Sequence, residues 1–153
     1  MKRLLPAVLT LALAMPCRAQ TAEDSVRSTV ADLFSAMLRA DAAALQPLFH
    51  DSARLCTVAP STAAAASYRC NPAAGFIAYV GSLQPGTADE RARVDQVLVD
   101  GPLALAWTPY RFYAKGAFSH CGVNLIQLVR SGGRWRILSI TDTRRKAPCP
   151  ELR

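Results

Sequence analysis

The sequence lacks the short motifs that identify the commonest enzyme classes. It contains no glycine-rich phosphate-binding loop, no Gly-x-Ser-x-Gly nucleophile elbow and no His-Glu-x-x-His zinc motif. A Cys-x-x-Cys pair is also absent, which argues against a thioredoxin-type redox site, and the cysteines and histidines form no zinc-like cluster. No motif therefore assigns a reaction to this chain, and we expect neither a cofactor nor a metal site.

Long apolar runs are absent beyond the first 19 residues. There, Leu4–Met15 follows Lys2 and Arg3 and is too short to span a membrane as a helix. This pattern is typical of a signal peptide, and small residues at the expected positions predict cleavage after Ala19. Lipidation at Cys17 is an alternative, although the proline before it fits that pattern poorly. We therefore predict an exported protein, periplasmic or secreted, with no stable membrane insertion after the signal is removed.

Residues 20–153 are predicted to form a single domain, of which residues 147–153 are an extended tail. Because the signal carries three cations and no acid, its removal lowers the net charge from +7 to +4. A nucleic-acid-binding protein would show a basic patch with aromatic residues or a known module. The basic cluster at residues 144–146 lacks both and is interpreted as a solvated strand end, so we expect no nucleic-acid partner.

Four cysteines remain after the signal: Cys56, Cys70, Cys121 and Cys149. An even count in an exported chain suggests two disulfides, for which three pairings are possible. We favour Cys56–Cys70, which closes a local loop, and Cys121–Cys149, which ties the tail to the sheet. A free, nucleophilic Cys121 beside His120 is disfavoured because neighbours on a strand point to opposite faces.

Residue periodicity predicts an α+β domain whose helices come mostly before an antiparallel sheet. Residues 60–67 are expected to form a loop. The last three strands form a meander between Trp107 and Thr143, with turns at Lys115-Gly116 and Gly132-Gly133. Helices are predicted at residues 23–40, 41–49 and 72–82, and earlier strands at residues 54–58 and 91–100.

Several residues are expected to bound these helices. Asp41 should cap the second helix, and Asn71 followed by Pro72 should begin the third. The second helix is expected to end in a turn at Asp51. His50 would then lie at its C-terminus, where a cation is favourable.

The order of elements and two local patterns resemble the nuclear transport factor 2-like superfamily, which includes SnoaL-like, ketosteroid-isomerase-like and lumazine-binding-like proteins. Residues 39–53 match its helix-to-strand signature, and Gly-Arg-Trp-Arg-Ile at residues 133–137 matches its final hairpin. The sequence at residues 119–124 resembles that of an uncharacterised bacterial branch of this superfamily. The resemblance implies a cone-shaped curved sheet wrapped around the first helix, with a cavity between them. It is weak on function, because the same cone serves enzymes, ligand binders and dimerisation modules.

Ketosteroid isomerase chemistry is the natural enzymatic reading of this resemblance. The position of its catalytic base, counted from the matching Asp41, is occupied here by Thr57, which cannot take a proton from carbon. The position of its oxyanion-binding tyrosine is occupied by Leu33. Two essential groups are missing, so we reject this reaction.

His120 and Asn124 are the best candidates for a site because they share one strand face with Gly122 between them. A two-residue turn in the last hairpin would place Trp135, Ile137, Ser139 and Thr141 on that face. A three-residue turn would bring Asp142 there instead, since a one-residue slip exchanges the two faces. We favour the first register. His120 is then either a structural, hydrogen-bonded histidine or a residue that contacts ligand or transfers protons.

The strand before His120 carries aromatic residues on both faces. We expect one face to line the cavity and the other to contact a partner subunit. Trp107 and Tyr110 are candidate ligand contacts, with core packing as the alternative. Arg111 could pair with an anionic ligand or could be an edge residue that extends its head to solvent. Asp142, by contrast, is interpreted as part of a surface charge cluster with the arginines that follow it.

These observations leave three hypotheses for function. The first is non-catalytic binding of a small, partly apolar molecule through His120, Asn124, Tyr110, Arg111 and Trp107. The second is a cofactor-free lyase, isomerase or hydrolase with His120 as acid/base and Asn124 or Tyr110 orienting the substrate. The third is a structural or dimerisation module with a filled cavity. A homodimer through the convex sheet face is compatible with all three.

Overall fold

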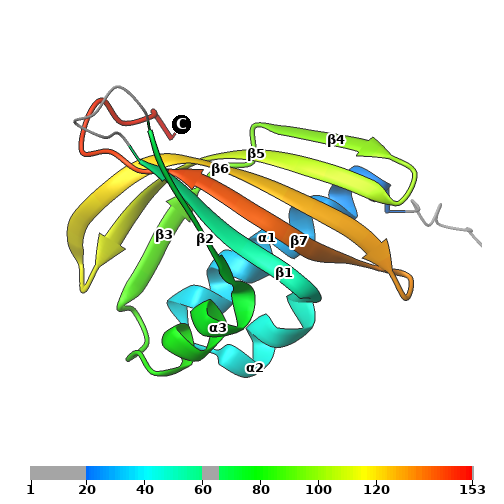
Figure 1. The fold of residues 1–153 in the computed structure, drawn as a ribbon, viewed down its shortest axis with the longest axis horizontal. Coiled ribbons are helices and arrows are strands. Elements are labelled where there is room, and N and C mark those ends of the chain that lie inside the picture. Colours follow the sequence, from blue (N-terminus) through cyan, green and yellow to red (C-terminus); the bar gives the residue numbers. More distant parts are fainter. Residues whose placement is uncertain (1–19, 60–65, 153) are drawn as a thin grey trace, which may run out of the picture.

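A computed structural model describes residues 20–59 and 66–152 as helices packed against one curved sheet. The predicted signal peptide and most of the predicted loop 60–67 lie outside the described residues. Figure 1 shows the sheet arching over the helices, which agrees with the predicted α+β cone. The helical elements are α1 (Ala22–Leu38), α2 (Ala42–Leu45), the short 3₁₀ helix η1 (Gln46–Leu48) and α3 (Ala73–Gly81).

The sheet has seven strands in the order β2-β1-β7-β6-β5-β3, with β4 paired to β5. Every pairing is antiparallel except that of β1 with β7, which is parallel. The strands are β1 (Phe49–Ala59), β2 (Ser67–Pro72), β3 (Ala88–Ala92), β4 (Gln96–Asp100), β5 (Leu103–Ala114), β6 (Ala117–Ser131) and β7 (Arg134–Thr143).

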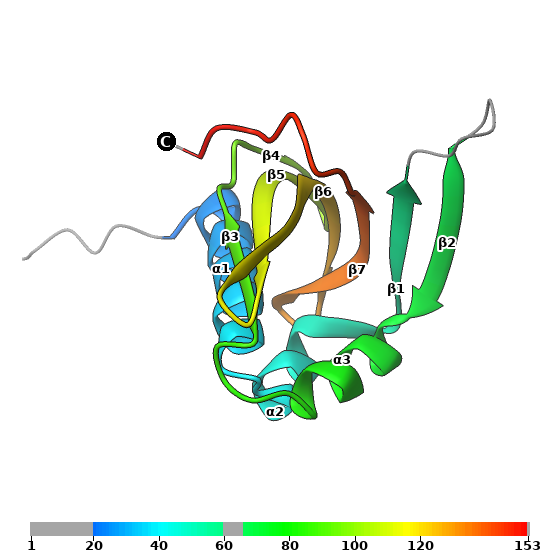
Figure 2. The ribbon, with the colours of Figure 1, turned by 90° about the vertical axis from the view of Figure 1, so that its left-hand side faces the viewer.

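Helix α1 forms where its apolar periodicity predicts it and lies across the concave face of the sheet (Figure 2). Thr21 caps its first turn: the Thr21 hydroxyl accepts from the Asp24 N–H, and the Asp24 carboxylate accepts from the Thr21 N–H. Val26, Val30 and Leu33 are almost completely buried along the inner face. Burial of each such side chain stabilises the fold by about 1.5–3 kcal/mol, so this face fixes the helix on the sheet.

Two of the predicted helix boundaries are wrong. Asp41 does cap α2, accepting from the Ala44 N–H, but β1 already begins at Phe49, so His50 and Asp51 lie in a strand. The buried Phe49 pairs with Ile137 of β7, and this long-range pairing overrides the local helix and turn signals.

Asn71 likewise is not a helix cap. It belongs to β2, opposite Leu55 of β1, and Pro72 takes the cap position of α3 without a side-chain bond. Strand β2 itself was not predicted, because it is short, mostly exposed and ends in a proline.

The strand predicted at residues 91–100 is two strands, β3 and β4, separated by three residues opposite Pro109. A proline has no N–H to donate, so the regular ladder cannot continue through it. Two isolated backbone hydrogen bonds still hold the segment to β5, one from the Arg93 N–H to the Pro109 carbonyl and one from the Asp95 N–H to the Trp107 carbonyl.

Both favoured disulfides are present. Cys56 pairs with Cys70 across the β1–β2 ribbon, and Cys121 pairs with Cys149. The second bond fastens the C-terminal tail over β6, where the Cys121 and Arg145 backbones also exchange two hydrogen bonds of 2.9 Å. The tail is therefore part of the fold and not a free end.

The last hairpin combines the predicted turn with an unpredicted bulge. Gly132 and Gly133 both have positive φ, and Ser131 pairs with Arg134, as a two-residue turn requires. One residue of β7 is then skipped, so that Gln127 faces Ser139 and Asn124 faces Asp142. The bulge moves Asp142 onto the face of Asn124 and removes Ser139 and Thr141 from it, which corrects the expected register.

Gly122 allows the end of β7 to cross β6 at unusually short range. A Cβ atom at Gly122 would lie 1.8 Å from the Thr143 carbonyl oxygen and 2.8 Å from its carbon. The face at Gly122 is thus filled by backbone, not left open to a ligand. This close approach also places the Thr143 carbonyl where the Tyr110 hydroxyl donates to it at 2.9 Å.

We predict that Gly122→Ala lowers the free energy of unfolding by at least about 2–3 kcal/mol, because backbone atoms must move to admit the methyl group. The matched control is Gly75→Ala in α3, where a Cβ meets nothing within 4 Å. That change should stabilise the protein by about 0.5–1 kcal/mol. Urea unfolding of both variants checks the pair, and a harmless Gly122→Ala would contradict the close crossing.

Candidate functional site

A small pocket lies between the concave sheet face and helices α1 and α3. Its volume is about 90 Å³. Its apolar walls come from Leu33, Phe34, Met37, Leu55, Phe76 and Ile140, and its other lining residues are Cys56, Thr57, Glu90, Asn124, Asp142 and Arg144. The pocket therefore pairs an apolar wall with polar side chains on the sheet, as binding sites for small organic molecules commonly do.

The polar side chains belong to a row that crosses the sheet. Strand register places Arg69 opposite Thr57, Thr57 opposite Asp142, Asp142 opposite Asn124 and Asn124 opposite Thr108. Residues paired across neighbouring strands point to the same face, so this row runs from β2 to β5 along the concave side. The β7 bulge is what puts an acid in the middle of it.

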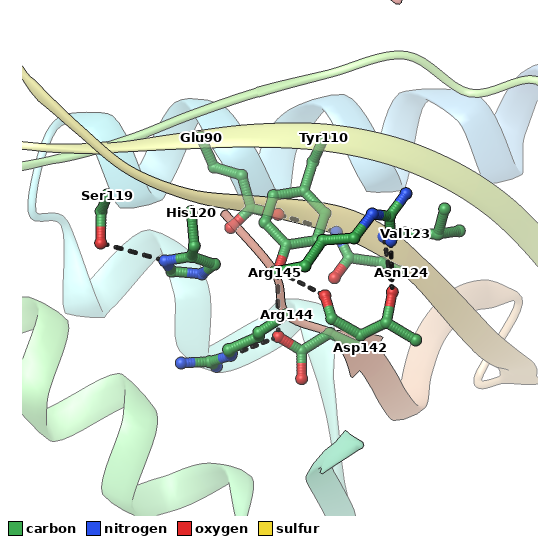
Figure 3. Close-up of polar contacts among 10 residues, drawn as sticks. Glu90, Tyr110, Ser119, His120, Val123, Asn124, Asp142, Arg144 and Arg145 are labelled. Atoms are coloured by element: carbon green, nitrogen blue, oxygen red, sulfur yellow. Dashed lines mark hydrogen bonds and ion pairs between the residues drawn. The ribbon is translucent and has the colours of Figure 1, made fainter. Parts of the chain in front are cut away.

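Asp142 is held by two donors inside this row. Its Oδ2 accepts from the Tyr110 hydroxyl at 3.2 Å and from Arg144 Nε at 2.6 Å, as Figure 3 shows. Asp142 is only 7% exposed and Tyr110 only 1%. Burial, followed by the negative charges of Asp142 and Glu90, raises the pKa of Tyr110 well above its usual value. Tyr110 is therefore a neutral, fixed hydrogen-bond donor at physiological pH.

Glu90 is the second acid of the site. It reaches in from β3 and accepts from Asn124 Nδ2 at 2.7 Å. Burial raises the pKa of Glu90 from 4.5 to about 7; the bond from Asn124 opposes this rise and the nearby Asp142 charge adds to it. Near neutral pH this carboxyl can therefore either donate or accept a proton.

His120 lies beside the site and not in the pocket lining. Its ring meets the edge of the Tyr110 ring at 5.7 Å and packs on Phe112 at 5.1 Å. Its Nδ1 is 3.1 Å from the Ser119 hydroxyl. Burial, and then the charge of Arg144, lower the pKa of His120 below its usual value. The imidazole is thus neutral at pH 7 and packed between aromatic rings.

The remaining predicted contacts are separated from the site. Trp107 and Arg111 alternate with Tyr110 along β5 and so lie on the opposite, convex face. Trp107 is 44% exposed, and Arg111 Nε donates to the Pro150 carbonyl of the tail. The structure thus brings Tyr110 and Asn124 together, places His120 next to them, and leaves Trp107 and Arg111 elsewhere.

Three residues that line the pocket were not among the predicted site residues: Glu90, Asp142 and Arg144. The prediction that Asp142 belongs to a surface charge cluster is wrong, because the bulge turns it inward. Arg144 then follows it onto the same face and forms the ion pair. Glu90 sits between Asp89 and Arg91 in a charged run that resembles an exposed edge strand, so no pattern marked it as buried.

The arrangement can bind and orient a polar group, and Glu90 can exchange a proton with it. Thr108 adds a further feature: its hydroxyl oxygen is buried and has no hydrogen-bond partner among the described residues. Within residues 20–59 and 66–152, no group of three His, Cys, Asp or Glu side chains is placed to hold a metal ion.

We predict that Glu90 makes stability fall as pH rises. Because its pKa is higher in the folded state than the usual 4.5, the folded protein binds more protons between about pH 4.5 and 7. The stabilisation is complete below pH 4.5 and is lost as pH passes through 7. Glu90→Gln keeps an acceptor for Asn124 and removes the titration.

The measurement is urea unfolding of wild type and Glu90→Gln at pH 4.5 and 8. Between pH 4.5 and 8, the free energy of unfolding of the variant should rise relative to that of wild type by on the order of 2 kcal/mol. The full pKa shift would give more, but Glu90 is only partly buried, so solvent weakens the effect. Because the pKa of His120 is lowered, its contribution to stability rises with pH, opposite to that of Glu90. His120 is present in both proteins, so its contribution cancels in the difference. A difference that does not change with pH would contradict the raised pKa.

Comparison with known structures agrees with the fold. A nuclear transport factor 2-like protein of unknown function from Silicibacter pomeroyi aligns with a TM-score of 0.61 and 21% identity, over 79% of this chain and 93% of that one. A similar protein of unknown function from Shewanella baltica gives 0.61 and 13%, over 80% and 93%. The "beta subunit of a putative aromatic-ring-hydroxylating dioxygenase" from Novosphingobium aromaticivorans gives 0.63 and 17%, over 85% and 93%.

No curated protein sequence matches this chain significantly. A family model described as "Putative lumazine-binding" matches residues 21–141, from the cap of α1 into β7, and ends one residue before Asp142. The match covers most of the chain and contains Glu90, Tyr110, His120 and Asn124. The protein therefore belongs to this lumazine-binding-like family within the nuclear transport factor 2-like superfamily.

Proposed function

We propose that the protein is an exported binding protein that holds a small, partly apolar molecule between α1 and the concave sheet face. The observation that carries this proposal is the pocket, whose helix side is apolar and whose sheet side carries polar side chains beside Leu55 and Ile140. Its polar groups are mostly bonded to each other, as Arg144 to Asp142 and Asn124 to Glu90 are. Such a wall is preorganised, so a ligand that binds there does not have to order it first.

Export is supported by the two disulfides, because such bonds persist mainly in oxidising compartments. In the part of the chain that the structure describes, no helix is long and apolar enough to cross a membrane. The predicted signal peptide at residues 1–19 would direct the chain to export. We place the protein in the periplasm or outside the cell.

A second candidate function is cofactor-free acid/base catalysis, with Glu90 in place of His120 as the base. Its pKa of about 7 and its position in the pocket lining favour this role. His120 suits the role less well, because it does not line the pocket and its pKa is lowered. We favour binding without catalysis, because the Glu90 carboxyl already accepts a hydrogen bond from Asn124 and Asp142 is already paired with Arg144.

A homodimer also remains part of the proposal. Exposed apolar side chains occur on β4, β5 and β6, away from the pocket: Leu98, Leu103, Trp107 and Phe118. Contact between two such surfaces would remove apolar area from water and leave both pockets accessible.

The binding proposal predicts a molecule that copurifies with the protein or is taken up from a metabolite mixture. Native mass spectrometry of chain exported to an oxidising compartment would detect it. Thr57→Trp should block uptake, because this side chain lines the pocket from β1. Val58→Trp is the matched control, since it puts the same indole on the opposite face of the same strand.

The expected result is an adduct of small mass in wild type and Val58→Trp and none in Thr57→Trp. Release of the molecule unchanged after prolonged incubation supports binding without catalysis, whereas its conversion, lost in Glu90→Gln, supports the second candidate. Bare protein in all three samples, with no uptake from the mixture, would contradict both.

A further inference from the structure

A second, larger recess adjoins the pocket on the concave side of the β1–β2 ribbon. Its volume is about 380 Å³, and it is lined by Thr57, Ala59, Ser67, Arg69, Asn71 and Arg144. Thr57 and Arg144 also line the pocket. The two spaces therefore meet at these residues, and a molecule too large for 90 Å³ could extend from one into the other.

The lining of this recess is basic. Two of its six residues are arginines, and none is an acid. Arg69 is exposed, and it forms neither an ion pair nor a side-chain hydrogen bond with any described residue. The hydroxyls of Thr57 and Ser67 and the amide of Asn71 provide further donors around it.

Arg144 lines this recess and is held by its partner Asp142. Its Nε is bonded to Asp142, which fixes the plane of the guanidinium, while its terminal N–H groups bond no described residue. A planar guanidinium fixed in this way presents its remaining donors in a fork that suits a carboxylate, sulfate or phosphate. Arg69 approaches from β2, on the other side of Thr57.

Charge is graded along the sheet. Arg69 lies on β2 at one edge of the strand order and Glu90 on β3 at the other, with Asp142 between them on β7. An anionic group is attracted by Arg69 at the first edge and repelled by ionised Glu90 at the second, while the charge of Asp142 is paired with Arg144. A bound anion would therefore take a single direction, with its charged group at the arginines and its apolar part against α1 and α3.

We propose that the ligand is a small amphiphilic anion whose oxyanion group lies between Arg69 and Arg144 and whose apolar body fills the adjoining pocket. This inference rests on the proposed binding function and adds the chemical class of the ligand. Carboxylates, sulfates and phosphates share the required chemistry. A neutral ligand would leave the donors of Arg69 and Arg144 without an anionic partner, and an inorganic anion would leave the apolar pocket unused.

The test titrates two matched pairs of probes into the exported, disulfide-bonded chain: benzoate with benzamide, and hexanoate with hexanamide. Inorganic sulfate is the third kind of probe. Two-dimensional amide NMR locates binding and gives the dissociation constants. The variants are Arg69→Ala and its control Arg54→Ala, which removes the same charge from the opposite face of the same ribbon.

We expect both acids to bind at least tenfold more tightly than their amides, with shifts at Thr57, Asn71 and Arg144. Arg69→Ala should weaken the acids about tenfold, as loss of one exposed charge-assisted bond would, and leave the amides unchanged. Arg54→Ala should have no effect. Added salt should weaken the acids more than the amides.

Other outcomes distinguish the failure of the anionic ligand class from the failure of the binding function. Amides that bind in the pocket as tightly as acids, or acids unaffected by Arg69→Ala, would overturn the anionic class and leave the binding function intact. Sulfate that binds as tightly as benzoate would show an anion site with no amphiphile preference and would also overturn the inference. No binding of any probe at these residues would count against the binding function itself.

Discussion

The crossing of β7 over Gly122 is the constraint on which the site depends. Because Gly122 has no side chain, the Thr143 backbone passes close enough to accept the Tyr110 hydroxyl, and the same hydroxyl bonds Asp142. Asp142 then fixes Arg144, so one close approach between two strands positions a neutral donor, an acid and a cation. The C-terminal tail locks the crossing through the Cys121–Cys149 bond and the backbone pair that precedes it. The candidate site and the packing of β6 and β7 therefore depend on the same close approach at Gly122.

Much of the fold could be predicted from the sequence because its signals are local. The apolar spacing of α1, the glycine turns of the meander and the even number of cysteines each depend on neighbouring residues or on simple counting. The favoured disulfide pairing and the superfamily resemblance are also confirmed. Tyr110 and Asn124, which were named as candidate contacts, lie on the same face because side chains alternate along β5 and β6.

The parts that failed depend on contacts between distant residues. The parallel pairing of β1 with β7 pulls His50 and Asp51 into a strand, and nothing near them indicates it. The bulge in β7 reverses the face of every residue after it, which is why Asp142 was taken for a surface charge. Glu90 was missed because the burial of an edge-strand acid is decided by the helix above it, not by its own neighbours. The row from Arg69 to Thr108 exists only once all five strands are in register.

The candidate site depends on the register of the last hairpin, in which a two-residue turn and a bulge set Asp142 opposite Asn124 on the concave face. Cross-strand nuclear Overhauser contacts between β6 and β7 test it most directly. We expect Asn124 to lie opposite Asp142 and Gln127 to lie opposite Ser139. Contacts that place Asn124 opposite Thr141, with the pairing unbroken from the turn, would put Asp142 on the other face and contradict the site.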